Sequence, residues 1–185
     1  MDEKYESTIG ATRLAIIKGD IVAQDTAAIV IAANSALAGG GGVDGAIHAA
    51  GGPIIIRECR KIIARIGKLE PGRAVVTQGG DLLARYVIHT VGPVWSGGNM
   101  NERQVLRDAY INCLAAAKEK GALSVSFPSI STGAYGFPVE LAAGVALLAV
   151  KEYIKKNGHF NEVRFVLFNA QDFKIYSDTA ISMGL

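Results

Sequence analysis

Short apolar runs alternate along this chain with longer segments that repeat apolar residues every three or four positions. Residues 13–18 (RLAIIK) and 28–32 (AIVIA) are apolar almost throughout and are bounded by polar residues or glycine. Runs of this length and character are typical of strands that are buried on both faces of a sheet. We predict strands at residues 13–18, 28–32, 74–78, 86–91, 124–128 and 162–168.

Helical spacing is clear in the intervening segments. Pro53 suits the first turn of a helix that carries apolar residues as far as Ile66, and Gly67 ends it. The expected helices span residues 43–50, 53–66, 102–120, 139–156 and 170–182. Strands interleaved with helices predict an α/β fold, a three-layer α/β/α sandwich with a mixed, largely parallel central sheet. We expect a flexible N-terminus over residues 1–10 and one domain over residues 11–185.

Composition and charge exclude several classes of protein. Half of the 185 residues are hydrophobic, 19% are charged, and the formal net charge is +2 with no run of five like charges. This balance predicts a soluble globular monomer without a nucleic-acid-binding patch. The longest apolar stretch, Val139 to Val150, is too short to span a bilayer, and the polar, acidic start is not a secretory signal. We therefore expect a cytoplasmic protein with no membrane partner.

The two cysteines, Cys59 and Cys113, give no sign of a metal site. Neither belongs to a CxxC motif, and no Cys/His cluster has the spacing of zinc ligands. Each lies in an amphipathic helical pattern, where a free cysteine usually behaves as a small hydrophobic residue. We expect both to be buried, and we expect neither a metal nor a cofactor.

Four consecutive glycines, Gly39 to Gly42, follow the second predicted strand. Such a run costs conformational entropy, so a fold rarely places it in a loop without a use. Without Cβ atoms the backbone can approach a ligand closely and turn several N–H groups toward an anion. The helix expected immediately afterwards adds its positive N-terminal end, which favours a phosphate group.

A second loop, Ser129 to Pro138, has the same design. It follows a predicted strand, precedes a predicted helix, and carries the hydroxyls of Ser131 and Thr132 beside the glycine backbone of Gly133 and Gly136. One glycine loop alone is equally consistent with an ordinary tight turn. Two such loops at the carboxyl ends of strands indicate one crevice that holds a diphosphate from both sides, with the start of the following helix contributing.

Other phosphate-binding and catalytic motifs fit less well. Residues 40–45 match GxGxxG, but a Rossmann domain places an acidic residue about 20 positions further on. Here that distance falls inside the predicted second helix, near Arg60 and Arg65. A Rossmann oxidoreductase is therefore disfavoured. The chain also lacks GxxxxGK[ST] and GxSxG, so neither a P-loop nor a serine-hydrolase elbow is supported.

Several motifs together resemble the macro domain family. They are Gly19-Asp20-Ile21, AAN ending at Asn34, GGGGVDGAIH ending at His48, HTVGPVW ending at Trp95, and PSISTGAYGFP ending at Pro138. The spacing of Asn34, the glycines and Asp44, combined with residues 133–136, is similar to the MacroD-type hydrolase branch. The likeness extends from about Thr12 to Tyr176, and the resemblance identifies residues 11–185 as one macro domain.

The resemblance implies ADP-ribose as the ligand and two hydrolytic activities. These are removal of the acetyl group from O-acetyl-ADP-ribose and removal of ADP-ribose from ester-linked acidic side chains of modified proteins. It implies that Asp20 accepts a hydrogen bond from the adenine amino group and that Phe168 packs on adenine. Asn34 and Asp44 would act at the distal ribose as the catalytic residues, beneath Tyr135. The full ADP-ribose-binding set that it implies is Asp20, Ile21, Asn34, Gly41, Gly42, Val43, Asp44, Ser131, Thr132, Gly133, Ala134, Tyr135 and Phe168.

Three positions depart from the family pattern. Ile31 stands where the family often has an asparagine, Ala27 where it often has an acidic residue, and Ala49 where an arginine often follows the histidine. The first two remove hydrogen bonds that would brace the loop before Asn34. The alternative function is therefore a non-catalytic reader of ADP-ribosylated proteins or free ADP-ribose.

The role of Asp44 also has alternatives. It can deprotonate a water that attacks the ester carbonyl, or only orient that water while the substrate's phosphate activates it. It can also be a carboxylate that stabilises a helix N-terminus and nothing more. Asn34 and Asp44 together favour the enzyme.

Overall fold

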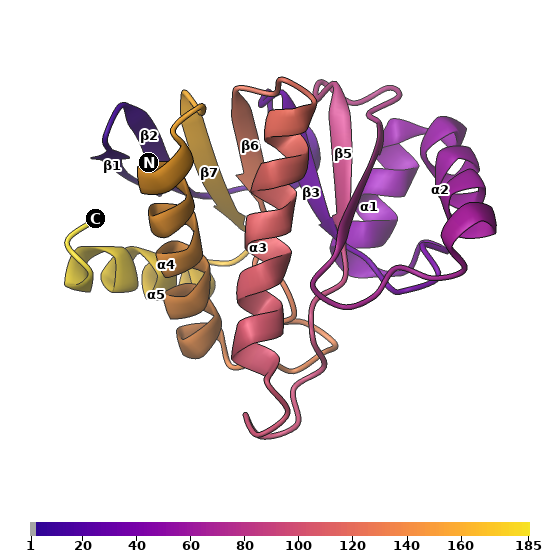
Figure 1. Cartoon of the computed structure of the whole chain (residues 1–185). Helices are drawn as coiled ribbons and strands as arrows, with labels where there is room; N and C mark the ends of the chain where they lie inside the picture. The colour runs from indigo at the N-terminus through magenta and orange to yellow at the C-terminus, as the bar shows by residue number, and fades with distance from the viewer. Residues whose placement is uncertain (1–2) are drawn as a thin grey trace.

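Within residues 3–185, which the computed structural model describes, seven strands form one mixed sheet (Figure 1). The order across the sheet is β1-β2-β7-β6-β3-β5-β4. The strands are β1 (Lys4–Ile9), β2 (Thr12–Lys18), β3 (Ala28–Ala32), β4 (Ala74–Gln78), β5 (Tyr86–Thr90), β6 (Ser124–Phe127) and β7 (Glu162–Leu167). The five central strands are parallel, and β1 and β4 pair antiparallel at the edges. The prediction of a mixed, largely parallel sheet is confirmed.

Helices cover both faces of this sheet (Figure 1). They are α1 (Gly42–Gly51), α2 (Pro53–Ile66), α3 (Glu102–Glu119), α4 (Val139–Asn157) and α5 (Ala170–Ser182), with a 3-10 turn, η1 (Ile21–Ala23). One hydrophobic core lies between the sheet and α3, α4 and α5, and the other lies between the sheet and α1, α2 and η1. This arrangement is the expected three-layer sandwich.

Strand β3 shows why the buried strands are apolar almost throughout. Ala28 and Val30 face the core under α3 and α4, whereas Ile29 and Ile31 face the core under α1 and α2. Successive side chains of a strand point to opposite faces, so a strand that is covered on both sides has no polar position to spare. Because helices cover both faces of the sheet, the apolar runs in the sequence coincide with the buried strands, and the predicted limits agree closely with the structure.

The N-terminal segment corrects one expectation. Residues 4–9 form β1, in register with β2 from Lys4 opposite Ile17 to Ile9 opposite Thr12, so a flexible end over residues 1–10 is wrong for this stretch. Lys4, Glu6 and Thr8 are exposed along this edge strand. One face of β1 meets water, and the resulting polar pattern hid the strand. Residues 1–2 lie outside the described residues.

The ends of two adjacent parallel strands position the glycine-rich loops. Strands β3 and β6 are neighbours, with Ala28 opposite Val125, and both end at the same edge of the sheet. The loop at residues 33–41 follows β3 and the loop at residues 128–138 follows β6. The two loops therefore face each other across one crevice, as predicted.

Among residues 3–185 no helix is long and apolar enough to cross a membrane.

Candidate active site

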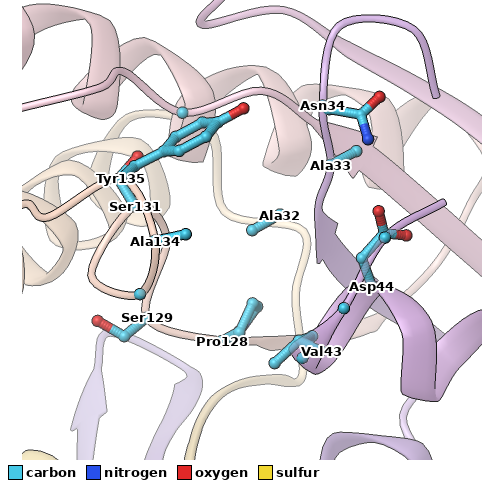
Figure 2. A pocket seen from close by; sticks show the side chains of 15 residues that line it. Ala32, Ala33, Asn34, Val43, Asp44, Pro128, Ser129, Ser131, Ala134 and Tyr135 are labelled. Carbon is cyan, nitrogen blue, oxygen red and sulfur yellow. The ribbon is translucent and has the colours of Figure 1, made fainter. Parts of the chain in front are cut away.

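A cavity of about 580 Å³ lies between the two loops (Figure 2). Asn34 and Asp44 stand on one side of it and Tyr135 stands on the other. The lining residues are Ala32, Ala33, Asn34, Gly40, Gly41, Gly42, Val43, Asp44, Gly92, Pro128, Ser129, Ser131, Gly133, Ala134 and Tyr135. The walls are thus mostly backbone and small side chains, with a few polar groups at one end.

A second cavity, of about 450 Å³, continues the first. Its walls include Asp20, Ile21 and Phe168, and Phe168 is 82% exposed. The two cavities share the walls formed by Gly42, Val43, Pro128, Ser129 and Gly133. They are therefore two ends of one cleft, and the two glycine-rich loops meet at its waist.

Asn34 holds the first loop in place. Its Oδ1 accepts hydrogen bonds from the N–H groups of Ala36 (3.2 Å) and Ala38 (3.3 Å), and its Nδ2 donates to the carbonyl of Gly39 (2.9 Å). The amide thus ties its own strand end to the start of the glycine run. These hydrogen bonds brace the loop without a contribution from Ile31, whose side chain is fully buried in the core under α1 and α2.

The first turn of α1 points at the waist of the cleft. Gly41 is the N-cap residue, and no side chain of the described chain caps it. Gly42 has a φ of +56°, which glycine adopts without strain. The first N–H groups of a helix have no intrahelical partner, so those of residues 42–44 are available to an anion. A helix N-terminus with this much free backbone is a site for phosphate oxygens.

Asp44 is a buried carboxylate in this first turn, only 6% exposed. His48 Nε2 lies 3.2 Å from Asp44 Oδ1, one turn along α1. This approach lacks hydrogen-bond geometry, and Oδ1 is buried without a hydrogen-bond partner within residues 3–185. Burial raises the pKa of Asp44, and the positive charge that His48 can carry opposes that rise. The group is therefore a more basic carboxylate than an exposed aspartate.

Ser131 forms the turn of the second loop in a left-handed conformation, with a φ of +68°. Its carbonyl accepts from the N–H of Phe137 (3.0 Å), and its buried Oγ has no hydrogen-bond partner in the described chain. A Cβ on Gly92 would lie 2.1 Å from that Oγ, so only glycine fits opposite Ser131. Sequence reasoning missed this function of Gly92, although the residue lies in the HTVGPVW motif.

The loop at residues 95–101 supports Tyr135. The Trp95 N–H donates to the Tyr135 carbonyl (2.8 Å), and the Trp95 ring packs on Phe137 with centroids 4.6 Å apart. The Glu102 carboxylate, 2% exposed, closes this loop by accepting from the N–H groups of Ser96 (2.9 Å), Gly98 (3.1 Å) and Met100 (2.6 Å). Sequence reasoning did not identify Glu102, because its partners are backbone groups of a loop.

Burial and hydrogen bonding act on the Glu102 carboxyl in opposite directions. Burial raises its pKa, but the N–H groups that it accepts favour the charged form and hold the pKa below its ordinary value.

Two buried tyrosines support the floor of the second loop from behind. Tyr110 in α3 accepts from the Ile130 N–H (3.1 Å), and its hydroxyl donates to the Pro128 carbonyl (3.3 Å). The Tyr176 hydroxyl in α5 lies 2.8 Å from Ser129 Oγ and shares a hydrogen bond with it. These contacts fix residues 128–130, of which Pro128 and Ser129 line the waist of the cleft.

Every residue of the predicted ADP-ribose-binding set borders one of the two cavities. Their roles remain predictions. Asp20 also caps η1, since its Oδ1 accepts from the Val22 N–H (3.0 Å), so it has a structural role in addition to its place in the cleft. Of the second loop, only residues up to Tyr135 line the cleft, and no residue at the start of α4 does. The prediction that the N-terminus of this helix helps to hold the diphosphate is therefore wrong.

Comparisons with known proteins agree with this geometry. A family model described as "Macro domain" matches residues 30–146. A macro domain-containing protein of Caldanaerobacter subterraneus is 54% identical over 89% of this chain and 94% of its own length. An O-acetyl-ADP-ribose deacetylase of Cronobacter sakazakii is 47% identical over 89% of this chain and 91% of its own length. The solved structure of an Oceanobacillus iheyensis macrodomain with ADP superposes with a TM-score of 0.95 at 38% identity, covering 99% of this chain and 97% of that one.

Proposed function

Because this chain belongs to the macro domain family, we propose that it binds ADP-ribose in the cleft and hydrolyses the ester of O-acetyl-ADP-ribose. The activity of the Cronobacter sakazakii relative, as its name states it, supports this proposal at 47% identity. The same ester chemistry extends the proposal to proteins that carry ADP-ribose on glutamate or aspartate side chains. The chemistry of the cleft walls supports both parts.

The cleft has a separate environment for each part of ADP-ribose. The adenine lies at the end formed by Ile21 and the exposed ring of Phe168, where Asp20 can accept a hydrogen bond from the adenine amino group. The diphosphate occupies the waist, between the first turn of α1 and the second loop. The distal ribose then reaches the end that holds Asn34, Asp44 and Tyr135 (Figure 2).

The observation that carries the catalytic proposal is the buried Asp44 carboxylate at this distal end. The carboxylate borders the cavity, and its buried Oδ1 lies 3.2 Å from His48 Nε2. A protein that only bound a diphosphate would gain nothing from a negative charge beside it. Asp44 is therefore better explained as a group that handles a water molecule.

In the proposed reaction a water oxygen attacks the acetyl carbonyl carbon while Asp44 accepts a proton from that water. The ester C–O bond then breaks, the ribose oxygen takes up a proton, and acetate and ADP-ribose leave. Burial, which raises the pKa of Asp44, makes it a better base than an exposed aspartate. If a phosphate of the substrate activates the water instead, Asp44 only orients it.

The test compares Asp44→Asn with the parent chain in single-turnover deacetylation and in calorimetric titration with ADP-ribose. We expect turnover to fall roughly 10²- to 10⁴-fold, the usual contribution of a positioned acid–base group. Affinity should fall much less or rise, because a negative charge near two phosphates is removed. Asp178→Asn in the exposed part of α5 is the matched control for the change of charge.

Each outcome separates the candidate functions. A parent chain that binds ADP-ribose but hydrolyses neither O-acetyl-ADP-ribose nor glutamate-linked ADP-ribose is a reader. Full turnover by Asp44→Asn would show that Asp44 is no more than a carboxylate at the start of a helix.

A further inference from the structure

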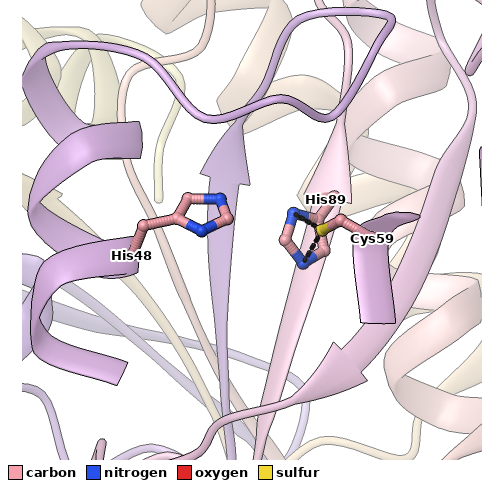
Figure 3. A group of neighbouring side chains, drawn as sticks. All are labelled: His48, Cys59 and His89. Atoms are coloured by element: carbon pink, nitrogen blue, oxygen red, sulfur yellow. Dashed lines mark hydrogen bonds between the residues drawn. The ribbon is translucent and has the colours of Figure 1, made fainter. Parts of the chain in front are cut away.

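Folding gathers three metal-ligating side chains beneath α1 and α2, outside the cleft (Figure 3). His48 lies on α1, Cys59 on α2 and His89 on β5, and one ligand atom of each lies within 4.8 Å of the others. Cys59 and His89 are fully buried and His48 is half-buried. Their separation along the chain is far from zinc-ligand spacing, so no motif in the sequence indicates this cluster.

We propose that His48, Cys59 and His89 form a binding site for a thiophilic divalent cation, with Zn²⁺ as its natural occupant. One thiolate and two imidazoles are the donors that Zn²⁺ prefers. Bond lengths of about 2.3 Å to sulfur and 2.0–2.1 Å to nitrogen place tetrahedral ligand atoms about 3.5 Å apart. The Cys59 Sγ is 3.9 Å from Nδ1 and 3.8 Å from Nε2 of His89, so the separation is close to that of two ligands, and the imidazole ring must turn to direct one nitrogen at a shared cation.

The hydrogen bonds of His89 leave one ring nitrogen free for a cation. Its Nε2 lies 2.9 Å from the hydroxyl of Thr77, and that hydroxyl donates its single proton to the carbonyl of Gln78 (3.2 Å). In the tautomer that carries its proton on Nε2, the Nε2–H group donates to Thr77 and the lone pair lies on Nδ1. A metal-bound histidine usually has this arrangement, with its other nitrogen donating to a fixed acceptor.

His48 lies beside a carboxylate and faces an access route. Its Nε2 is 3.2 Å from Asp44 Oδ1, an ion-pair contact without hydrogen-bond geometry, so Nδ1 is the nitrogen more open to a cation. His48 also lines a separate, open cavity of about 420 Å³ between α1 and α2, with Gly45, Gly52 and Pro53 among its other walls. A cation and a water that completes its coordination can enter there. The three ligand atoms lie within 4.8 Å of one another, and His48, the one side chain of the three that is not fully buried, has the most room to adjust around a cation.

The site is tested by metal binding and does not rest on the proposed hydrolase. The full chain, treated with chelator and dialysed, is titrated with Zn²⁺ against a chromophoric chelator and separately with Co²⁺. We expect one equivalent of Zn²⁺ per chain and, with Co²⁺, a thiolate-to-metal charge-transfer absorption. Both signals should be lost in Cys59→Ser, whereas Cys113→Ser, which alters the other buried cysteine in α3, should keep them.

Two further variants keep the test independent of folding at position 59. His48→Gln changes a half-buried side chain and should also abolish binding of one equivalent. Thr77→Val removes only the outer hydrogen-bond partner of His89 and should weaken Zn²⁺ affinity roughly 10- to 100-fold. Circular dichroism confirms that each variant is folded. The proposal is overturned if the parent chain binds no Zn²⁺ at micromolar concentration, or if folded Cys59→Ser or His48→Gln binds it as the parent does.

Discussion

Gly45 allows the conformation of the glycine-rich loop to be changed without touching a residue of the cleft wall. It lies in α1, one residue after Asp44, and a Cβ at this position would be 2.5 Å from the carbonyl oxygen of Gly40. Ordinary contacts of a Cβ begin near 3.4 Å, so Gly45→Ala must push the backbone at Gly40 away by about 0.9 Å. Gly40 forms part of the cavity that contains Asp44.

Gly45→Ala has two opposing effects on the free energy of unfolding, but only one of them, the displacement of the loop, affects ligand binding. Replacing a helical glycine by alanine stabilises a helix by about 0.8–1.0 kcal/mol. Displacing the loop offsets some of this gain. A misplacement of about 1 Å near a reacting group can cost about 10²-fold in rate. We therefore expect a melting temperature close to that of the parent, together with strongly reduced ADP-ribose affinity and turnover.

The matched control is Gly144→Ala in α4, where a Cβ would have no atom within 4 Å. This variant should be more stable than the parent by about 1 kcal/mol and should bind and turn over normally. Thermal unfolding, calorimetric titration with ADP-ribose and single-turnover deacetylation are measured for both variants. If Gly45→Ala is stabilised as much as Gly144→Ala and binds like the parent, the contact with Gly40 does not set the shape of the loop.

Two other predictions concern the supports of the cleft. The folded-state pKa of Glu102 is below its ordinary value of 4.5, so the stability that it contributes is complete above pH 4.5 and is lost as the pH falls through the folded-state pKa. Urea unfolding across this range should show that loss in the parent and much less of it in Glu102→Gln; equal pH profiles would contradict the assignment. Tyr176→Phe should cost about 1–3 kcal/mol, because it leaves the hydroxyl of Ser129 without its partner. The control is Tyr153→Phe, because the Tyr153 ring packs on Phe160. Equal losses in the free energy of urea unfolding for the two variants would refute this role for Tyr176.

Local patterns predicted the elements that are buried on both faces. The limits of β3 and of α2 agree with the prediction because continuous apolar character and the Pro53 and Gly67 boundaries are properties of neighbouring residues. Strand β1 was missed because its polar face meets water. The cleft was predicted because both loops follow strands that end at one edge of the sheet, which a sequence can indicate without a structure.

The features that the sequence did not indicate depend on contacts between distant segments. Gly92 must be a glycine because of Ser131, and His89 meets Cys59 across 30 positions. Neither contact leaves a spacing pattern, since residue types alone do not reveal which segments pack together. Glu102 is similar, because a carboxylate that accepts backbone N–H groups looks in the sequence like any acidic residue at the start of a helix.

With isoleucine at position 31, the Asn34 side chain braces the loop, and its hydrogen bonds show how many of its polar groups remain for a ligand. The Oδ1 of an asparagine has two lone pairs, and here both face backbone N–H groups of the loop. Its Nδ2 has two hydrogens, and the carbonyl of Gly39 takes one of them. Asn34 therefore braces the loop with three of its four hydrogen-bonding positions and has a single N–H to offer to a ribose hydroxyl. Its contribution to affinity is then expected to lie mainly in the loop that it holds, and the proposed reaction depends on Asp44 for its chemistry.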